Sequence, residues 1–177
     1  MAIRPLVSVP DPVLTRKARR VKEIDANIHK LVQDMIETMH DAHGVGLAAN
    51  QVGVPLRIAV IQLPDDEEPT VLINPEVVRR EGEREEDEGC LSIPGYQGRV
   101  KRSLKVRVKA LGLDGKPFRI KAEGDLRAQV LEHETDHLNG HLYVERLVSR
   151  DQLWKIGERE GEDEEEPATA EAASSGG

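Results

Sequence analysis

Two histidines four residues apart, His133 and His137, are the side chains of this sequence best placed to do chemistry. On a helix of 3.6 residues per turn they project from nearly the same face, about 6 Å apart, and can bind one divalent metal ion. Glu134 lies roughly 100° around the helix, beside the ion, where it can move protons for a water molecule. The His-Glu-x-x-His spacing therefore predicts metal-assisted hydrolysis, and the competing interpretation is a chance match on a solvated helix.

A third metal ligand is expected, because catalytic centres of this kind normally use three protein ligands. The sequence has a single cysteine, Cys90, which cannot form an intramolecular disulfide. A lone cysteine is often a small core residue, but this one lies in a polar Glu-Gly-Cys turn. Since a metal ion deprotonates a thiol and holds it as a ligand, we predict Cys90 as the third ligand.

The stretch from residue 44 to residue 51, Gly-Val-Gly-Leu-Ala-Ala-Asn-Gln, is rich in small residues. Such residues let the backbone approach a ligand closely, and the stretch also fits a helix end followed by a strand. It is not a phosphate-binding loop, because the Gly-Lys-Ser/Thr ending is missing. The side-chain amide of Gln51 is of the type that donates to a developing oxyanion.

Taken together, these stretches resemble the peptide deformylase family. The matching segments are Gly-x-Gly-Leu-Ala-Ala-x-Gln at 44–51, Glu-Gly-Cys-Leu-Ser at 88–92 and His-Glu-x-Asp-His-Leu-x-Gly at 133–140, in the family's order. The resemblance extends from about Leu6 to Leu147 and implies removal of the formyl group from the N-terminal methionine of nascent polypeptides, releasing formate. One departure is Glu132, where the family commonly has glutamine. Its negative charge is expected to alter the metal's electronics modestly.

The resemblance also assigns roles in the reaction. The metal ligands are Cys90, His133 and His137. Glu134 serves as the general base and then the general acid, while the Gln51 amide and the backbone N–H of Leu91 stabilise the oxyanion. One divalent ion per chain is expected. The resemblance implies Fe²⁺, although the donor set equally suits Zn²⁺, Ni²⁺ or Co²⁺.

A binding site for the methionine side chain is implied in the same way. Its expected residues are Val45, Gly46, Leu126 and Val130. The backbone of Gly46 would hold the peptide in an extended pose. Leu126 and Val130 precede His133 by seven and three residues on its helical face, and the alternative is that both belong to the ordinary core. Tyr96 and Arg99 are further candidates for contact with the peptide beyond the methionine.

Two other classes of protein compete with this interpretation. A His-Glu-x-x-His zinc endopeptidase needs a third ligand after the motif, but His141 lies only four residues after His137, on a helix that Gly140 is expected to end. A structural metal-binding module needs four protein ligands, and no second cysteine is present to supply the usual fourth.

Caps and periodicity place these motifs on secondary structure. Asp11-Pro12 predicts a short helix to about Ala18. Asp25 caps a longer helix, whose apolar residues recur at intervals of three and four until Gly44 ends it. Asp125 caps the helix that carries the histidines.

Strands are expected at residues 57–63, 70–78 and 99–113, with a hairpin turn at 113–116. Six acids between residues 81 and 88 indicate a solvated edge, although Glu88 could instead orient the cysteine turn and pair with Arg102. Because strands outnumber helices, we predict an α+β fold, with partly antiparallel β-sheets wrapped around a central His-Glu-x-x-His helix.

Composition predicts one domain with an aliphatic core, since the chain has 177 residues and only 2% aromatics. The catalytic domain is expected at 1–148, a short C-terminal helix at 149–160 with Trp154 packed on the body, and a disordered tail at 161–177. From Glu158 onward there are eight acids and one base, Arg159, so the rest of the chain is nearly neutral.

The absence of an N-terminal apolar run and of any long apolar stretch predicts a cytoplasmic protein with no membrane partner. The expected partners are N-formylmethionyl nascent peptides and, transiently, the ribosome. Docking through the tail is doubtful because the tail is acidic, and no direct nucleic-acid binding is expected.

Overall fold

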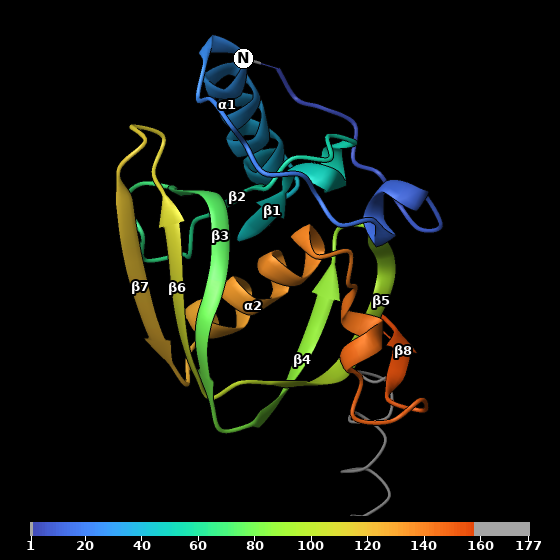
Figure 1. Ribbon diagram of the computed structural model, residues 1–177. Helices are drawn as coiled ribbons and strands as arrows, with labels where there is room; N and C mark the ends of the chain where they lie inside the picture. Colours follow the sequence, from blue (N-terminus) through green and yellow to red (C-terminus); the bar gives the residue numbers. More distant parts are fainter. Residues whose placement is uncertain (1, 158–177) are drawn as a thin grey trace, which may run out of the picture.

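In the computed structural model, which describes residues 2–157, two antiparallel β-sheets surround one central helix (Figure 1). The larger sheet has the strand order β1-β2-β3-β6-β7, with bounds Gly46–Ala48, Ile58–Ile61, Thr70–Glu81, Lys105–Leu111 and Pro117–Glu123. The smaller sheet has the order β4-β5-β8, with bounds Arg84–Cys90, Ile93–Arg102 and Leu153–Lys155. The predicted α+β class is confirmed, and every strand pairing within these two sheets is antiparallel.

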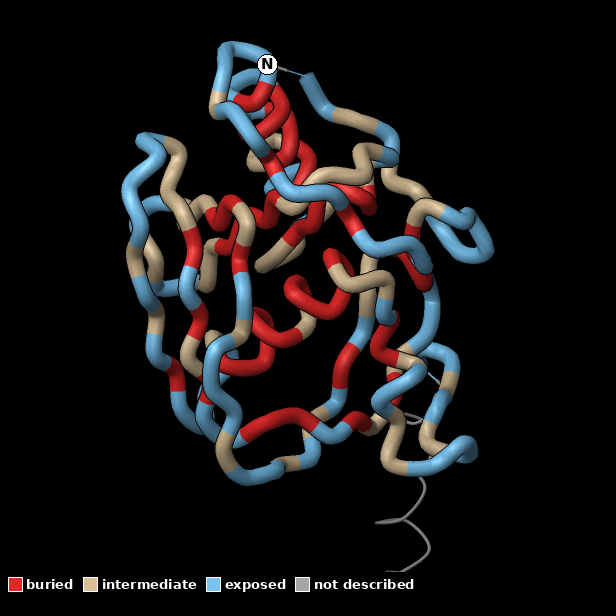
Figure 2. Tube along the Cα trace, viewed as in Figure 1, coloured by how far each residue is buried: buried red, intermediate tan, exposed pale blue. Residues whose placement is uncertain are grey.

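The central helix α2, Leu126–Leu138, begins and ends where its caps predict. The carboxylate of Asp125 accepts a hydrogen bond from the Ala128 N–H, and Gly140 adopts a φ of 81° just beyond the last turn. Figure 2 shows that most of α2 is buried between the sheets. A helix enclosed on several sides holds its side chains in fixed directions, which suits a site built on it.

The other long helix, α1, runs from Ala26 to Asp41 and packs its apolar stripe into the core. Asp25 caps it as predicted, by accepting from the Ile28 N–H. Gly44 is predicted to be the left-handed residue that follows the helix. That residue is instead His43, one position earlier, with a φ of 55°. The Gly44 N–H then donates to the Met39 carbonyl, which satisfies the helix end.

The predicted helix at 12–18 is only a 3-10 turn, Pro12–Thr15, capped by Asp11. Beyond it the chain is extended, because Ala18 and Arg19 donate backbone hydrogen bonds to Leu138 and Pro55 instead of continuing a helix. Two further 3-10 turns, Ala49–Val52 and Tyr143–Arg146, connect the remaining elements.

The single strand predicted at 99–113 is in fact two strands, β5 and β6, separated at Ser103 and Leu104. The Ser103 N–H and hydroxyl donate to the carboxylate of Glu132, so the chain leaves the smaller sheet there and enters the larger one. Tertiary contacts with α2 therefore divide a segment that alternates like one strand.

The short helix predicted at 149–160 is also wrong over the part that the structure describes. Residues 153–155 form β8, which pairs with β5 in the register Gln97↔Trp154. One side of β5 offers backbone N–H and C=O groups to residues 153–155, whereas a short helix there would be only marginally stable. The tail predicted at 161–177 lies outside the described residues. Within residues 2–157, no helix is long and apolar enough to cross a membrane.

Candidate metal and catalytic site

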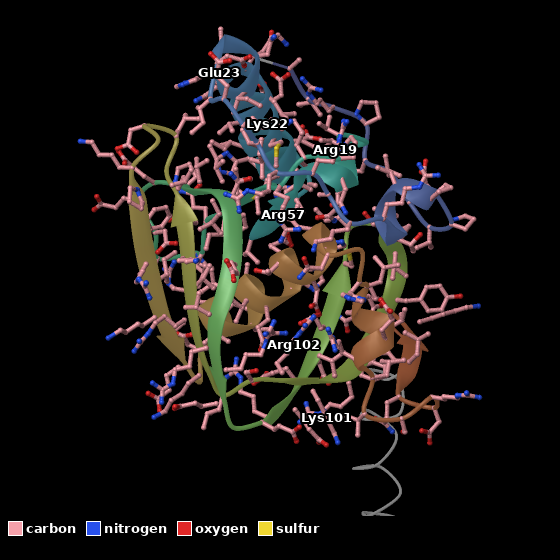
Figure 3. The ribbon with its side chains drawn as sticks, viewed as in Figure 1. Arg19, Lys22, Glu23, Arg57, Lys101 and Arg102 are labelled. Carbon is pink, nitrogen blue, oxygen red and sulfur yellow. The ribbon has the colours of Figure 1, made fainter. Side chains whose placement is uncertain are left out.

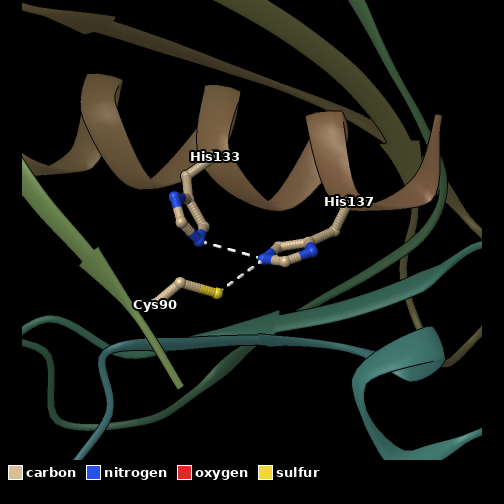
Figure 4. Close-up of side chains that lie close together, drawn as sticks. All are labelled: Cys90, His133 and His137. Atoms are coloured by element: carbon tan, nitrogen blue, oxygen red, sulfur yellow. Dashed lines mark hydrogen bonds between the residues drawn. The ribbon is translucent and has the colours of Figure 1, made fainter. Parts of the chain in front are cut away.

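Three donor atoms from two distant segments meet beside α2 (Figure 4). The Cys90 sulfur lies 3.2 Å from Nε2 of His137, which lies 3.0 Å from Nε2 of His133. The three donor atoms all lie within 4.8 Å of one another, and among the described residues they form the one group of this kind. The structure thus brings together the three residues predicted as metal ligands.

The ring of His133 is oriented from behind by Glu88. Its Nδ1 donates to the Glu88 carboxylate at 2.6 Å, which leaves Nε2 directed at the cysteine and at His137. Arg102 in turn donates to both Glu88 oxygens, at 3.0 and 2.6 Å. A carboxylate that fixes the remaining nitrogen of a ligating histidine also fixes the direction of its metal-binding nitrogen.

The Arg102 guanidinium is buried and serves two carboxylates, because its third nitrogen donates to Asp136 at 2.7 Å. Asp136 also accepts from Arg146 at 3.1 Å, and Gln129 donates to Glu88 at 3.2 Å. The sequence hinted at the pairing of Glu88 with Arg102. Asp136 belongs to the motif at 133–140, but the sequence did not indicate its partners, which come from other elements.

These contacts shift the pKa values of the buried groups in opposite directions. Burial acts to raise the pKa of Glu88, but the adjacent His133 and Arg102 lower it to about 2. Although burial opposes it, the Glu88 charge raises the pKa of His133 well above its ordinary value. Burial and the neighbouring His133 lower the pKa of His137, which favours a neutral imidazole with a lone pair to share.

Glu134 is the buried carboxyl that faces this group. Its Oε1 lies 3.7 Å from Nε2 of His133, and its Oε2 has no hydrogen-bond partner among the described residues. Burial raises the pKa of Glu134 to about 7. A carboxyl whose pKa lies near 7, and which has one oxygen without a hydrogen bond beside the metal ligands, can both accept and return a proton.

Gln51 lies next to Cys90. Its amide nitrogen is 3.6 Å from the Cys90 sulfur and donates to the Ser92 hydroxyl at 3.2 Å, while its oxygen accepts from the Ala48 N–H. The neighbouring Asn50 ties the 3-10 turn to the carbonyl of His137 at 2.6 Å. The turn that carries Gln51 is therefore fixed directly to the end of α2.

A cavity of about 690 Å³ opens in front of these groups. It is lined by all four residues predicted for the substrate pocket, Val45, Gly46, Leu126 and Val130. Leu91 and Tyr96 also line it, together with two residues that the sequence did not single out for this role, His43 and Ile156. Gly46 packs so closely that an added Cβ would lie 3.0 Å from both Glu134 and Val130.

Two residues, Arg99 and Glu132, lie elsewhere than the sequence suggested, whereas His141 lies outside the site as the sequence indicated. Arg99 is outside the cavity lining and pairs with Asp87 instead. The Glu132 carboxylate is directed away from the donor atoms and accepts hydrogen bonds from Ser103 and Arg80. No direct contact therefore supports its expected effect on the metal. His141 is exposed and bonded to Glu145, which leaves an endopeptidase-type third ligand without support.

Comparison with known proteins agrees with this arrangement. The profile of the polypeptide deformylase family matches residues 3–153. A peptide deformylase of Dehalococcoides mccartyi is 55% identical over 157 residues, covering 89% of this chain and 93% of the relative. A crystal structure of a peptide deformylase from Legionella pneumophila superposes with a TM-score of 0.81 at 44% identity, covering 96% of this chain and 98% of that one. One from Synechococcus elongatus, solved in complex with actinonin, has a TM-score of 0.80 at 41% identity, covering 84% and 81%.

Proposed function

This chain belongs to the peptide deformylase family, and we propose that it removes the formyl group from the N-terminal methionine of nascent polypeptides, releasing formate. The observation that carries the proposal is the meeting of Cys90, His133 and His137 beside Glu134, whose Oε2 has no hydrogen-bond partner among the described residues. Cys90, His133 and Glu134 also line the large cavity. A closed structural metal site would need neither an open cavity nor a free carboxyl.

The donor set fits a divalent metal ion. Two imidazole nitrogens face each other at 3.0 Å with a thiol sulfur beside them, an arrangement that a shared cation stabilises. Cys90, His133 and His137 would hold the ion, Fe²⁺ in our proposal. When bound, it supplies a Lewis acid that lowers the pKa of water and polarises the formyl carbonyl.

The side chains around the ligands would move the protons and stabilise the charge. Glu134 takes the proton from the attacking water and returns it to the methionine amine as the C–N bond breaks. The Gln51 amide and the Leu91 N–H stabilise the negative charge that develops on the formyl oxygen when water adds to the formyl carbon. Glu88 keeps His133 in one orientation throughout, because Arg102 keeps Glu88 in place.

Substrate recognition would use the walls of the same cavity. Leu126, Val130 and Val45 offer an apolar surface to the methionine side chain, and Gly46 lets the peptide backbone approach Glu134 closely. Leu126 is well exposed for a leucine, which suits a pocket wall better than the core.

The test is formate release from a formyl-Met-Ala-Ser peptide, using protein prepared anaerobically and loaded with Fe²⁺ or Ni²⁺. We expect turnover by the parent and, for Glu134→Ala with full metal content, a rate lower by about 10²- to 10⁴-fold. Cys90→Ala should lose the metal. A parent that carries one metal ion per chain but releases no formate would refute the substrate assignment, and near-normal turnover by Glu134→Ala would refute its role.

The setting of the reaction is part of the proposal. We infer a cytoplasmic enzyme that meets its substrates close to the ribosome, without docking through the acidic residues after Gly157. Tail-dependent, saturable binding to ribosomes at physiological salt would contradict this inference. Metal analysis of anaerobically purified protein would check the choice of iron.

A further inference from the structure

A row of basic side chains lies between the first 3-10 turn and α1, in a segment that contributes no residue to the metal site or to the substrate cavity. Five exposed cations occur within seven residues, and we call them the cationic strip: Arg16, Lys17, Arg19, Arg20 and Lys22. Within residues 2–157, no carboxylate lies within ion-pair distance of any of the five, whereas most other arginines of the chain are paired. The concentration stands out because residues 1–157 are nearly neutral, most of the net charge of −8 coming from the acids after Gly157.

The backbone of the strip is held in an extended conformation by neighbouring elements. Ala18 donates to the Leu138 carbonyl, and Arg19 donates to Pro55 and accepts from the Arg57 N–H. Val21 exchanges two hydrogen bonds with the side chain of Asn74, at 2.8 and 3.0 Å. The positive charges are therefore carried by a fixed segment, so a ligand would not have to order it.

Beside the strip, a cavity of about 340 Å³ is lined by Lys17 and Arg20 together with Arg57 and Arg80. Arg57 is half-buried, and its guanidinium donates only to uncharged oxygens, those of Leu138, Pro75 and Asn139. Burial and the charge of Arg20 lower the pKa of Arg57. Cations that repel one another in a half-buried place are stabilised when an anion binds between them.

Few acids oppose this charge. Glu76 lines the cavity but already pairs with Lys109 at 3.4 Å, and Arg80 pairs with Glu132 at 3.2 Å. Glu23 follows the strip directly in sequence. In Figure 3, Arg19, Lys22 and Arg57 lie in the upper half of the view with Glu23 above them, whereas Lys101 lies at the opposite end of the molecule.

We propose that the cationic strip and the cavity beside it bind the phosphate backbone of an RNA strand. Seven extended residues span about 20 Å, which is too long for one phosphate and suits several phosphates in a row. An anionic membrane fits less well, because no exposed large hydrophobic residue lies in the strip. This departs from the expectation, drawn from the sequence, of no nucleic-acid binding.

The choice of RNA rests on the proposed function, since nascent polypeptides are made on RNA-rich particles. The substrate cavity and the cavity beside the strip are separate sites, because they share no lining residue. Lys17 and Arg20 have no part in the proposed reaction, so replacing them should leave formate release unchanged.

The experiment measures binding of a fluorescein-labelled single-stranded RNA of about 20 nucleotides by anisotropy, between about 50 and 200 mM KCl. We expect the double variant Lys17→Glu/Arg20→Glu to bind at least about tenfold more weakly. The slope of log affinity against log salt should fall by about two. The matched control Lys101→Glu/Lys121→Glu changes the net charge equally at exposed positions outside the strip, and should keep the parent affinity within about twofold.

Equal losses in both variants would show that only net charge matters and would overturn the proposal, as would absence of RNA binding by the parent at the lowest salt. Binding of inorganic phosphate or of anionic vesicles without binding of RNA would also overturn it. Formate release, measured on the same preparations, reports folding. A parent that binds RNA through the strip but releases no formate would refute only the proposed function.

Discussion

Replacing Gly46 by alanine tests how closely the rate depends on the position of Glu134. The new methyl carbon would lie 3.0 Å from Cγ and Cδ of Glu134 and from Cγ1 of Val130. Since carbon atoms pack at about 3.5–4.0 Å, the carboxylate must move by roughly half an ångström. A misplacement of about 1 Å costs up to about a hundredfold in rate, so we expect kcat to fall about tenfold.

The same overpacking should destabilise the fold by about 1–3 kcal/mol, which lowers Tm by about 2–4 °C per kcal/mol for a domain of this size. Formate release is measured with saturating formyl-Met-Ala-Ser on metal-replete protein, beside the control Gly89→Ala. Gly89 lines the same cavity, but its added Cβ would make ordinary contacts of 3.4 and 3.5 Å. A Gly46→Ala enzyme with parent kcat and full metal content would refute the argument from position.

Three further changes have defined outcomes. Arg102→Met leaves Glu88 and Asp136 buried without their cation, so we expect a loss of about 3–5 kcal/mol in unfolding by urea and metal affinity weaker by about 10- to 100-fold in a chelator titration. For Asp34, the Ala2 N–H and nearby cations lower the pKa from 3.8 to about 2 against burial. The unfolded chain therefore takes up this proton first, and stability is lost as the pH falls from about 4 toward 2. Asp34→Asn should flatten that part of the stability curve. Ile156 is an exposed apolar residue of the substrate cavity. For Ile156→Ser we expect the ratio of kcat/KM for a peptide with leucine after the formylmethionine to that for a peptide with serine there to fall by roughly threefold.

Each of these has a matched control on the same element or surface. Arg99→Met removes an arginine of β5 whose ion pairs, with Glu85 and Asp87 of β4, are partly exposed, so it should cost little. Asp41→Asn, at the exposed end of α1, should leave the acid limb of the stability curve unchanged. Leu153→Ser, an exposed residue of β8 outside the cavity, should keep the parent selectivity. Parallel effects in a variant and its control would contradict the corresponding prediction.

What could be read from the sequence was chiefly what is local along the chain. The four-residue spacing of His133 and His137 puts both on one face of any helix, and Asp125 and Gly140 determine where that helix begins and ends. Both features depend on backbone geometry over a few residues, so they are independent of the rest of the fold. The position of Cys90 near them followed from motif order and chemistry.

Only the tertiary structure decided the features that depend on partners distant in sequence. The strand β8 exists because β5 offers it an edge, which a stretch predicted as helical cannot reveal. Glu132 precedes the predicted ligand His133, yet its carboxylate accepts a hydrogen bond from Ser103 and is directed away from the donor atoms. Arg57 lines the cavity beside the cationic strip although it comes from a different part of the chain. Such pairings depend on which surfaces packing brings into contact, and that choice is made by the whole core rather than by any short stretch of sequence.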